Sequence, residues 1–549
     1  MTAFLKKKIL GASLGHCVHV AGILSFLNAA ERYDYTTHFL GPATSIEKLT
    51  QAILDEDPDI IALSYRLTPE VLKELLVSLQ KEIEEKSIGK KTFIFGGTPP
   101  AAEVARQSGL FDAVFVGGES PEEITDFLKG QVEEARQVEM PPQNLVDRIA
   151  HASPYPILRH HFGRPTVAET VEGAREIALS ETIGVISIGP DQNAQESFFR
   201  PGEMKRGQDG AGGVPLRKPE DLEAIYAATR CGNYPLLRCY SGTRDLIRWA
   251  EMSQKTINIA WGAVPLLWYN RLDGRSERTP VESIRENQET MRWYAEHDIP
   301  LEVNESHHWS LRDAPDVVAV ATAFLAACNA KKMGVRNYIS QYMFNTPAKT
   351  SPSMDLAKML AKIELIESLH DEHFTSMRQT RAGLTSLSTD PDVAKGQLAA
   401  SCYYQLALEP KIVHIVGFCE ADHAATPADV IESAKIVQGV LKNYFLDPLP
   451  MINDERIGKR KERLVEEAKH LLEAIRRIAP DEVDEPWTDP ENLARAVKVG
   501  LLDAPHLCGN PHASGKIFTR VIDGVCVAVD LEKGNVLSEK DRISQILNS

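Results

Sequence analysis

Three hydrophobic runs near the N-terminus constrain the fold of this chain more than any other feature of its sequence. They end at Ser13, at Ser64 and at Gly96, and stretches with helical spacing of apolar residues separate them. Strands that alternate with helices in this way form a parallel sheet, because a parallel pair needs a long crossover connection. We therefore predict a doubly wound α/β domain, whose ligand would lie outside the carboxyl ends of its strands.

Small and polar residues follow each of these strands. The segment Cys17-Val18-His19-Val20-Ala21-Gly22 comes after the first run and places an imidazole ahead of a glycine that opens a helix. Ser64 ends the second run, and Gly96-Gly97 ends the third. Because the carboxyl ends of parallel strands meet at one edge of a sheet, we expect these residues to line one ligand site.

The pattern resembles the Rossmann-like (flavodoxin-like) cobalamin-binding domain of mutases and methionine synthases. That domain carries Asp-x-His-x-x-Gly, Ser-x-Leu and Gly-Gly at the same three places. The resemblance implies that the histidine is the lower axial ligand of cobalt, that the serine contacts the displaced base of the cofactor, and that the glycines leave room for its nucleotide tail. The matching residues are His19, Gly22, Ser64, Gly96 and Gly97.

Two positions depart from the family pattern. Cys17 stands where the family has aspartate, and Arg66 stands where it has leucine. The aspartate accepts the other ring N–H of the histidine, which fixes the tautomer and raises the basicity of the ligand. A neutral thiol does this poorly. We therefore expect Cys17 to leave a weaker His19–cobalt bond, unless His16 or a backbone carbonyl takes over the role.

Other ligands of such a domain are less well supported. A dinucleotide site needs a Gly-x-Gly-x-x-Gly turn, and Gly11-x-x-x-Gly15 does not provide it. An ordinary doubly wound domain with one incidental histidine remains the alternative, although the spacing and the glycines argue against it.

Length and charge bound the remaining possibilities. A chain of 549 residues has room for two or three domains, one of them an α/β barrel. The net charge of −16 disfavours nucleic acid and anionic membranes as partners. Without a long apolar run or a signal-peptide pattern, we expect a cytoplasmic protein with no membrane association.

Cysteines and histidines suggest no obvious metal site. The eight cysteines contain no C-x-x-C pair, so neither a zinc knuckle nor a redox motif is indicated. Histidine groupings without a convincing ligand set occur at His307-His308, at His370 with His373, and at His506 with Cys508 and His512.

The order of elements predicts four regions. These are a cobalamin-binding domain over 1–135, a proline-containing linker over 136–163, a (β/α)₈ TIM barrel over 164–485, and a C-terminal α+β appendix over 486–549 packed on the barrel. The seven β/α repeats that point to this barrel have their predicted strands at 183–188, 235–239, 256–261, 301–304, 337–341, 374–378 and 411–417.

From about residue 300 to 530 the chain resembles the barrel subunit of glutamate mutase (methylaspartate mutase), a carbon-skeleton isomerase. In that family the cobalamin module is a separate subunit, whereas here it would be fused ahead of the barrel. The resemblance implies adenosylcobalamin as the cofactor. The carrying segments are 303–311, 316–327, 334–337, 412–421 and 509–516.

Four barrel residues are candidates for the substrate and cofactor site. Arg238 falls close to a carboxylate-binding arginine of the family if one insertion is allowed, and Arg164 and Arg200 are weaker counterparts in loops. Arginine suits this role because its guanidinium binds a carboxylate through two hydrogen bonds. A surface arginine is the alternative for all three. Glu420 matches a family glutamate that contacts the adenosyl ribose.

Departures in the barrel change the expected substrate. Val416 replaces a family lysine four residues before Glu420. The segment 259–269, which in the family is rich in glycine and tyrosine and carries an acid, here has no acid and two tryptophans. A substrate that is less polar than glutamate, or that lacks its ammonium group, is therefore indicated.

We thus predict a radical carbon-skeleton mutase acting on a small carboxylic acid other than glutamate. A cobalamin-dependent methyltransferase is the first alternative. A weaker His19–cobalt bond, and Val416 in place of the family lysine, would suit it. A non-catalytic cobalamin carrier or sensor is the second. We expect a homodimer, with an auxiliary subunit left open.

Overall fold

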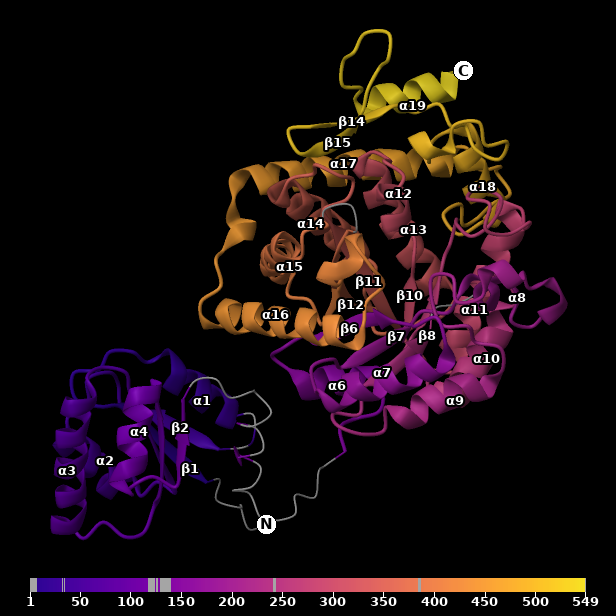
Figure 1. Ribbon diagram of the computed structural model, residues 1–549. Helices are drawn as coiled ribbons and strands as arrows, with labels where there is room; N and C mark the ends of the chain where they lie inside the picture. The colour runs from indigo at the N-terminus through magenta and orange to yellow at the C-terminus, as the bar shows by residue number, and fades with distance from the viewer. Residues whose placement is uncertain are drawn as a thin grey trace. The chain divides into compact units, whose positions relative to one another are not determined.

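The computed structural model describes residues 7–31, 33, 35–116, 124, 127–128, 140–239, 243–383 and 387–548. The chain divides into two compact units, Met1–Val138 and Glu139–Ser549, and each is described here by itself (Figure 1). Within the described ranges, no helix is both long and apolar enough to cross a membrane.

A parallel sheet of five strands forms the centre of the N-terminal unit, in the order β2-β1-β3-β4-β5. The strands are β1 (Lys8–Ser13), β2 (Thr36–Phe39), β3 (Ile60–Tyr65), β4 (Thr92–Gly97) and β5 (Ala113–Phe115). This is the flavodoxin-like order, whose switch point lies between β1 and β3. The predicted doubly wound domain is confirmed.

Helices connect these strands and cover both faces of the sheet. They are α1 (Ala21–Glu31), α2 (Ile46–Glu56), α3 (Pro69–Glu85) and α4 (Pro99–Ser108). Leu49 of α2 and Leu72 of α3 belong to the core on one face, and Ile23 and Phe26 of α1 belong to the core on the other. Every residue of β3 is buried, because a central parallel strand is covered on both sides.

Eight parallel strands form the second unit, in the order β8-β7-β6-β13-β12-β11-β10-β9. The first and last strands in sequence, β6 and β13, pair with each other, so the sheet is a nearly closed barrel. Between β8 and β9, the Ala260 N–H donates to the Leu237 carbonyl at 2.9 Å. The predicted TIM-like barrel is confirmed. The strands are β6 (Ile157–Phe162), β7 (Val185–Ile188), β8 (Leu236–Cys239), β9 (Gly262–Val264), β10 (Leu301–Val303), β11 (Asn337–Phe344), β12 (Thr375–Ala382) and β13 (Ile412–Ile415).

A helix follows each strand and packs outside the barrel. These helices are α7 (Val167–Leu179), α9 (Pro219–Ala228), α10 (Leu246–Ile257), α11 (Pro280–Glu296), α13 (Asp316–Lys332), α14 (Pro352–Glu367), α15 (Pro391–Gln405) and α16 (Pro427–Leu446). The long helix α17 (Glu455–Arg477) packs on α13 and α14. This second layer explains why α13 is buried almost all round rather than along one stripe.

The C-terminal segment is a small α+β region. It contains α18 (Pro490–Val499), the antiparallel pair β14 (Thr519–Ile522) and β15 (Val525–Ala528), and α19 (Glu539–Asn548). In Figure 1 this region, coloured yellow, lies beside α17, and α19 contacts that helix.

The barrel begins earlier in the chain than we predicted. The stretch 136–163, assigned to a linker, contains α6 (Leu145–Ala152) and the first barrel strand, β6. Prolines precede β6, and Arg159, His160 and His161 interrupt its apolar pattern, so the strand resembles a loop in sequence. The predicted boundary at 135–136 lies outside the described residues.

A second correction concerns the strand predicted at 256–261. Thr256 and Ile257 are the last residues of α10, and β9 begins only at Gly262. The helix extends this far because Trp249, Ser253 and Thr256 continue its buried face at helical spacing.

Candidate functional site

A cavity of about 420 Å³ lies at the carboxyl edge of the N-terminal sheet. Strand register explains its composition, because Ser13 lies opposite Ser64 and Ser64 lies opposite Gly96. The structure therefore brings the predicted strand-end residues to one place, where His19, Gly22, Ser64, Arg66, Gly96 and Gly97 all line the cavity.

The walls of this cavity fit a bound cofactor. The Ser64 hydroxyl is buried and has no hydrogen-bond partner among the described residues, although buried polar groups nearly always have one. A Cβ built on Gly22 or Gly96 would meet no atom within 4 Å, so these glycines keep open a space that the protein does not fill. Glycine is needed at position 97 for a different reason, because a Cβ there would clash with the Tyr65 carbonyl oxygen at 2.5 Å.

Cys17 contacts His19 but does not line the cavity. Its side chain is fully buried, whereas His19 is exposed. The Cys17 Sγ is 3.8 Å from His19 Nδ1. The thiol thus contacts the ring nitrogen that the family aspartate would contact, but over a longer distance and without a charge.

We expect Cys17→Asp to raise the affinity of the full chain for cobalamin by about tenfold, since partners of metal-bound histidines contribute about 10- to 100-fold. A carboxylate in contact with Nδ1 would make His19 a stronger ligand. Titration of the apoprotein with the cofactor measures the effect, and Cys17→Ala is the matched control, expected to bind like the wild type. Equal affinities for the aspartate and alanine variants would show that this position does not tune the histidine.

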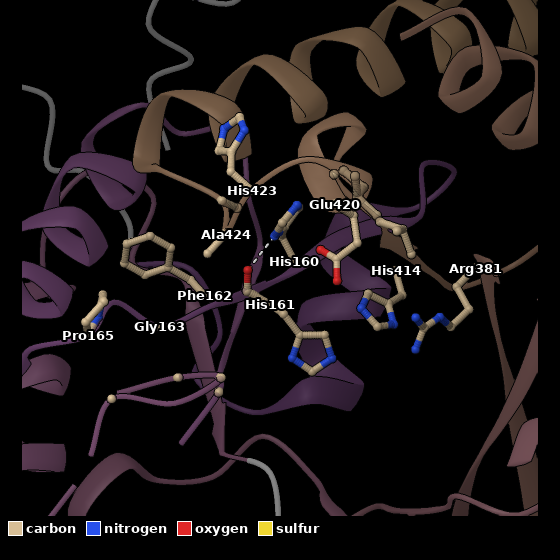
Figure 2. A pocket seen from close by; sticks show the side chains of 18 residues that line it. His160, His161, Phe162, Gly163, Pro165, Arg381, His414, Glu420, His423 and Ala424 are labelled. Carbon is tan, nitrogen blue, oxygen red and sulfur yellow. Dashed lines mark hydrogen bonds between the residues drawn. The ribbon is translucent and has the colours of Figure 1, made fainter. Parts of the chain in front are cut away.

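A second cavity, of about 460 Å³, opens at the carboxyl ends of the barrel strands (Figure 2). His160 and His161 of β6, Arg381 of β12, His414 of β13 and Glu420 line it. This end of a TIM barrel is where active sites form, because the βα loops converge there.

Three imidazoles of this cavity, those of His160, His161 and His414, are neutral. His160 and His414 are buried, and the rings of His161 and His414 meet edge to face at 4.7 Å. Burial lowers the pKa of His160 to about 4. Burial, and after it the charge of Arg159, holds the pKa of His161 and of His414 well below the ordinary value. These rings therefore offer hydrogen bonds but no charge.

A charged cluster fills the barrel interior. The Glu302 carboxylate on β10 lies 3.5 Å from Arg159 on β6 and 3.4 Å from Arg238 on β8, and it accepts a 2.9 Å hydrogen bond from Trp261 Nε1. Burial alone would raise the pKa of Glu302, but Arg238, Arg159 and the hydrogen bond from Trp261 oppose it, and the pKa lies below its usual value. The glutamate is therefore ionised.

Positive charge exceeds negative charge in this interior. Arg159 also donates to Ser187 Oγ at 2.7 Å and to Gln379 Oε1 at 2.6 Å. Arg238, however, has two nitrogens, Nε and Nη1, that are buried with no hydrogen-bond partner among the described residues. Burial lowers the pKa of Arg381 to about 10, so it is charged at neutral pH.

The sequence-predicted barrel residues differ in where they lie. Arg238 is buried inside the barrel and is not among the residues that line the cavity, but it is in register with Ser187, which is itself in register with His161 of the cavity. Glu420 is exposed on the cavity wall, where partial desolvation raises its pKa and Arg381 opposes the shift.

Arg164 and Arg200 do not line the cavity. Arg164 Nη1 donates to the Ala424 carbonyl at 3.3 Å and so supports the loop that forms one wall. Arg200 is paired with Asp245 at 2.9 Å. The Asp245 carboxylate therefore already balances the charge of Arg200.

Sequence reasoning missed several residues of the barrel site. Arg159, His160 and His161 lie on the strand that we assigned to a linker, and Arg381 lies beyond the predicted end of β12 at 378. An Arg-His-His run between apolar residues was the available signal, because charged residues within a strand of a barrel point to its interior or its mouth.

Comparison with known proteins identifies the first unit. Residues 7–125 match the family model described as the B12 binding domain. No curated protein matches the chain. A solved cobalamin-binding protein from Desulfitobacterium hafniense DCB-2 is 22% identical, over 23% of this chain and 57% of that chain, with a TM-score of 0.19.

A second solved structure covers more of the chain. The cobalamin-dependent S-adenosylmethionine radical enzyme OxsB is 11% identical, over 90% of this chain and 72% of that chain, with a TM-score of 0.19. At these scores neither structure supports an argument about activity, and the resemblance to glutamate mutase stays a prediction. The family match and the cavity that fits the cofactor agree that this chain contains a cobalamin-binding domain.

Proposed function

We propose that this protein is a cobalamin-dependent enzyme, and specifically a carbon-skeleton mutase that acts on a small carboxylic acid. The observation that carries the proposal is the excess of guanidinium groups inside the barrel, together with the two unpartnered nitrogens of Arg238. A buried donor without a partner costs about 1–3 kcal/mol, and more when it is charged. A substrate carboxylate would supply both the missing charge and the missing hydrogen bonds.

The remaining residues have distinct roles in this proposal. Adenosylcobalamin, when bound, supplies the radical chemistry. His19 would bind its cobalt, and Ser64 would offer the cofactor a hydrogen bond from its buried hydroxyl. In the barrel, Arg238 would hold the carboxylate and Glu420 would accept hydrogen bonds from the adenosyl ribose. The neutral rings of His161 and His414 would orient the substrate without competing for its charge.

A methyltransferase is the second candidate, and the contact between Cys17 and His19 favours it. The 3.8 Å separation and the neutral thiol make His19 a weakly supported ligand. Cobalamin, when bound, would supply a methyl carrier in such a reaction, and a loosely held His19 would suit that role.

We expect Arg238→Met to weaken binding of small carboxylates to the full chain by at least about tenfold, because charge-assisted hydrogen bonds contribute about 1.5–3 kcal/mol each. The measurement is calorimetric titration with a panel of mono- and dicarboxylic acids, repeated as turnover with adenosylcobalamin and with methylcobalamin. Arg200→Met is the matched control, since Arg200 is paired away from the cavity.

Each outcome of this experiment separates the candidates. Turnover with the adenosyl form, lost in Arg238→Met and kept in Arg200→Met, supports the mutase. Turnover with the methyl form alone supports the methyltransferase. Cobalamin binding with no carboxylate binding in the wild type would contradict the mutase, and a further lack of turnover with either form of the cofactor would favour a carrier. The predicted homodimer and cytoplasmic location stay predictions.

A further inference from the structure

A cysteine, a histidine and an aspartate come together in the loop after β13. Cys419 lies in the short helix η5 (Phe418–Ala421), His423 follows it, and Asp429 lies in the first turn of α16. Each offers one ligand atom, and these atoms all lie within 4.8 Å of one another. Thiolate, imidazole and carboxylate are the ligands that Zn²⁺ takes in proteins.

The fold fixes these side chains in place. Asp429 Oδ2 accepts hydrogen bonds from the Thr426 N–H at 2.9 Å and the Thr426 hydroxyl at 2.6 Å, which caps α16. His423 Nε2 lies 3.1 Å from the same Asp429 oxygen, and His423 Nδ1 lies 2.7 Å from Asp422. Cys419 is 2% exposed, so its thiol is held within the protein. Little rearrangement would be needed to form a metal site.

His160 provides an independent indication of a ligand. Its Nδ1 lies 2.5 Å from the His161 carbonyl oxygen, so this nitrogen carries the proton and Nε2 is a bare acceptor. Nε2 is buried and has no hydrogen-bond partner in the described part of the chain. Metal-bound histidines usually have this arrangement, with the other nitrogen donating to a carbonyl or carboxylate.

The bare nitrogen and the thiol face the same small space. A Cβ built on Gly417 would lie 2.9 Å from His160 Nε2 and 3.5 Å from Cys419 Sγ. In Figure 2 the free nitrogen of His160 points away from the His161 carbonyl, toward the wall that carries His423 and Glu420. The absence of a side chain at Gly417 keeps this space open.

We propose that Cys419, His423 and Asp429, with His160 as the fourth ligand, bind one divalent transition-metal ion at the mouth of the barrel. Zn²⁺ fits best, because one thiolate and one carboxylate balance its charge and the mixed S, N and O donors suit a tetrahedral ion. The ion would join β6, the loop after β13 and α16, and would thereby fix the short helix that carries Glu420. The proposal does not rest on the cobalamin reaction, because none of the four ligands is given a role in it.

The test is zinc binding by the full chain, prepared without added corrinoid and titrated against a chromophoric chelator. We expect one Zn²⁺ per chain, and an affinity lowered at least about tenfold in Cys419→Ser and in His423→Gln, as for losses that perturb a ligand shell. The controls are Cys402→Ser, a buried cysteine outside the site, and the double variant Cys17→Ser/His19→Ala, which removes a second Cys–His pair. Both should bind like the wild type.

Co²⁺ spectroscopy and circular dichroism test whether Cys419 binds the metal in a folded protein. With Co²⁺ in place of Zn²⁺, the wild type should show a thiolate-to-metal charge-transfer band that Cys419→Ser lacks, while circular dichroism confirms that the variant is folded. A wild type that binds no zinc, or a folded Cys419→Ser with unchanged affinity, would overturn the site. A folded His160→Gln variant with unchanged affinity would overturn the four-ligand arrangement.

Discussion

Glu302→Gln is expected to destabilise the barrel by about 3–5 kcal/mol, the usual cost of leaving a buried charge without its partner. The carboxylate lies between Arg159 and Arg238, at 3.5 and 3.4 Å, and its side chain is 1% exposed. A neutral amide at this position would leave both guanidinium groups facing each other without a counter-charge. Arg238→Met should cost less, because Glu302 would keep Arg159 and Trp261.

Urea denaturation followed by tryptophan fluorescence measures this effect. All six tryptophans lie between residues 249 and 487, so the signal reports the barrel unit and not the cobalamin-binding domain. Glu364→Gln is the matched control, since its pair with Lys461 is on the surface and such pairs contribute about 0–1 kcal/mol. If Glu302→Gln were no more destabilising than Glu364→Gln, the interior cluster would not depend on this carboxylate.

His19→Ala is expected to remove the histidine nitrogen from cobalt and to lower cobalamin affinity by at least about tenfold. His19 lines the cavity of the N-terminal unit together with Ser64 and the paired glycines, and its side chain is exposed to that space. Electron paramagnetic resonance of the chain reconstituted with cob(II)alamin detects the ligand directly. Labelling the protein's histidines with ¹⁵N should change the nitrogen splitting in the wild type and have no effect in His19→Ala.

His16→Ala is the control for this experiment, because His16 is an exposed neighbour that does not line the cavity. It should retain the label-sensitive splitting. If ¹⁵N labelling left the nitrogen splitting of the wild type unchanged, the cofactor would keep its own base as the ligand. In that case the match to the B12 binding domain would stand, while the role of His19 would be wrong.

The cobalamin-binding domain could be predicted from sequence because its site uses strand ends. The residue after a buried parallel strand is placed by the strand itself, and the register of Ser13, Ser64 and Gly96 brings the three ends together. The local sequence pattern of each strand therefore determines where the residue after it lies. The thiol of Cys17 could be placed for the same reason, and its Sγ lies near His19 Nδ1.

The barrel site could be predicted only in part, because its residues lie within strands rather than after them. Polar side chains that point into a barrel break the apolar pattern by which strands are recognised, and β6 was missed for that reason. The cluster at Cys419, His423 and Asp429 was missed because its members join two helices across a loop. Spacing along the chain does not reveal such a contact.

The charged cluster inside the barrel also bears on how the protein folds. Arg159, Arg238 and Glu302 come from β6, β8 and β10, so their contacts join segments far apart in the chain. Contacts of such high sequence separation form after local helices and neighbouring strands, because loop closure must precede them. Interactions that form late act mainly on the rate of unfolding. The same charges that would bind a substrate would therefore also slow the opening of the barrel and prolong the lifetime of its native state.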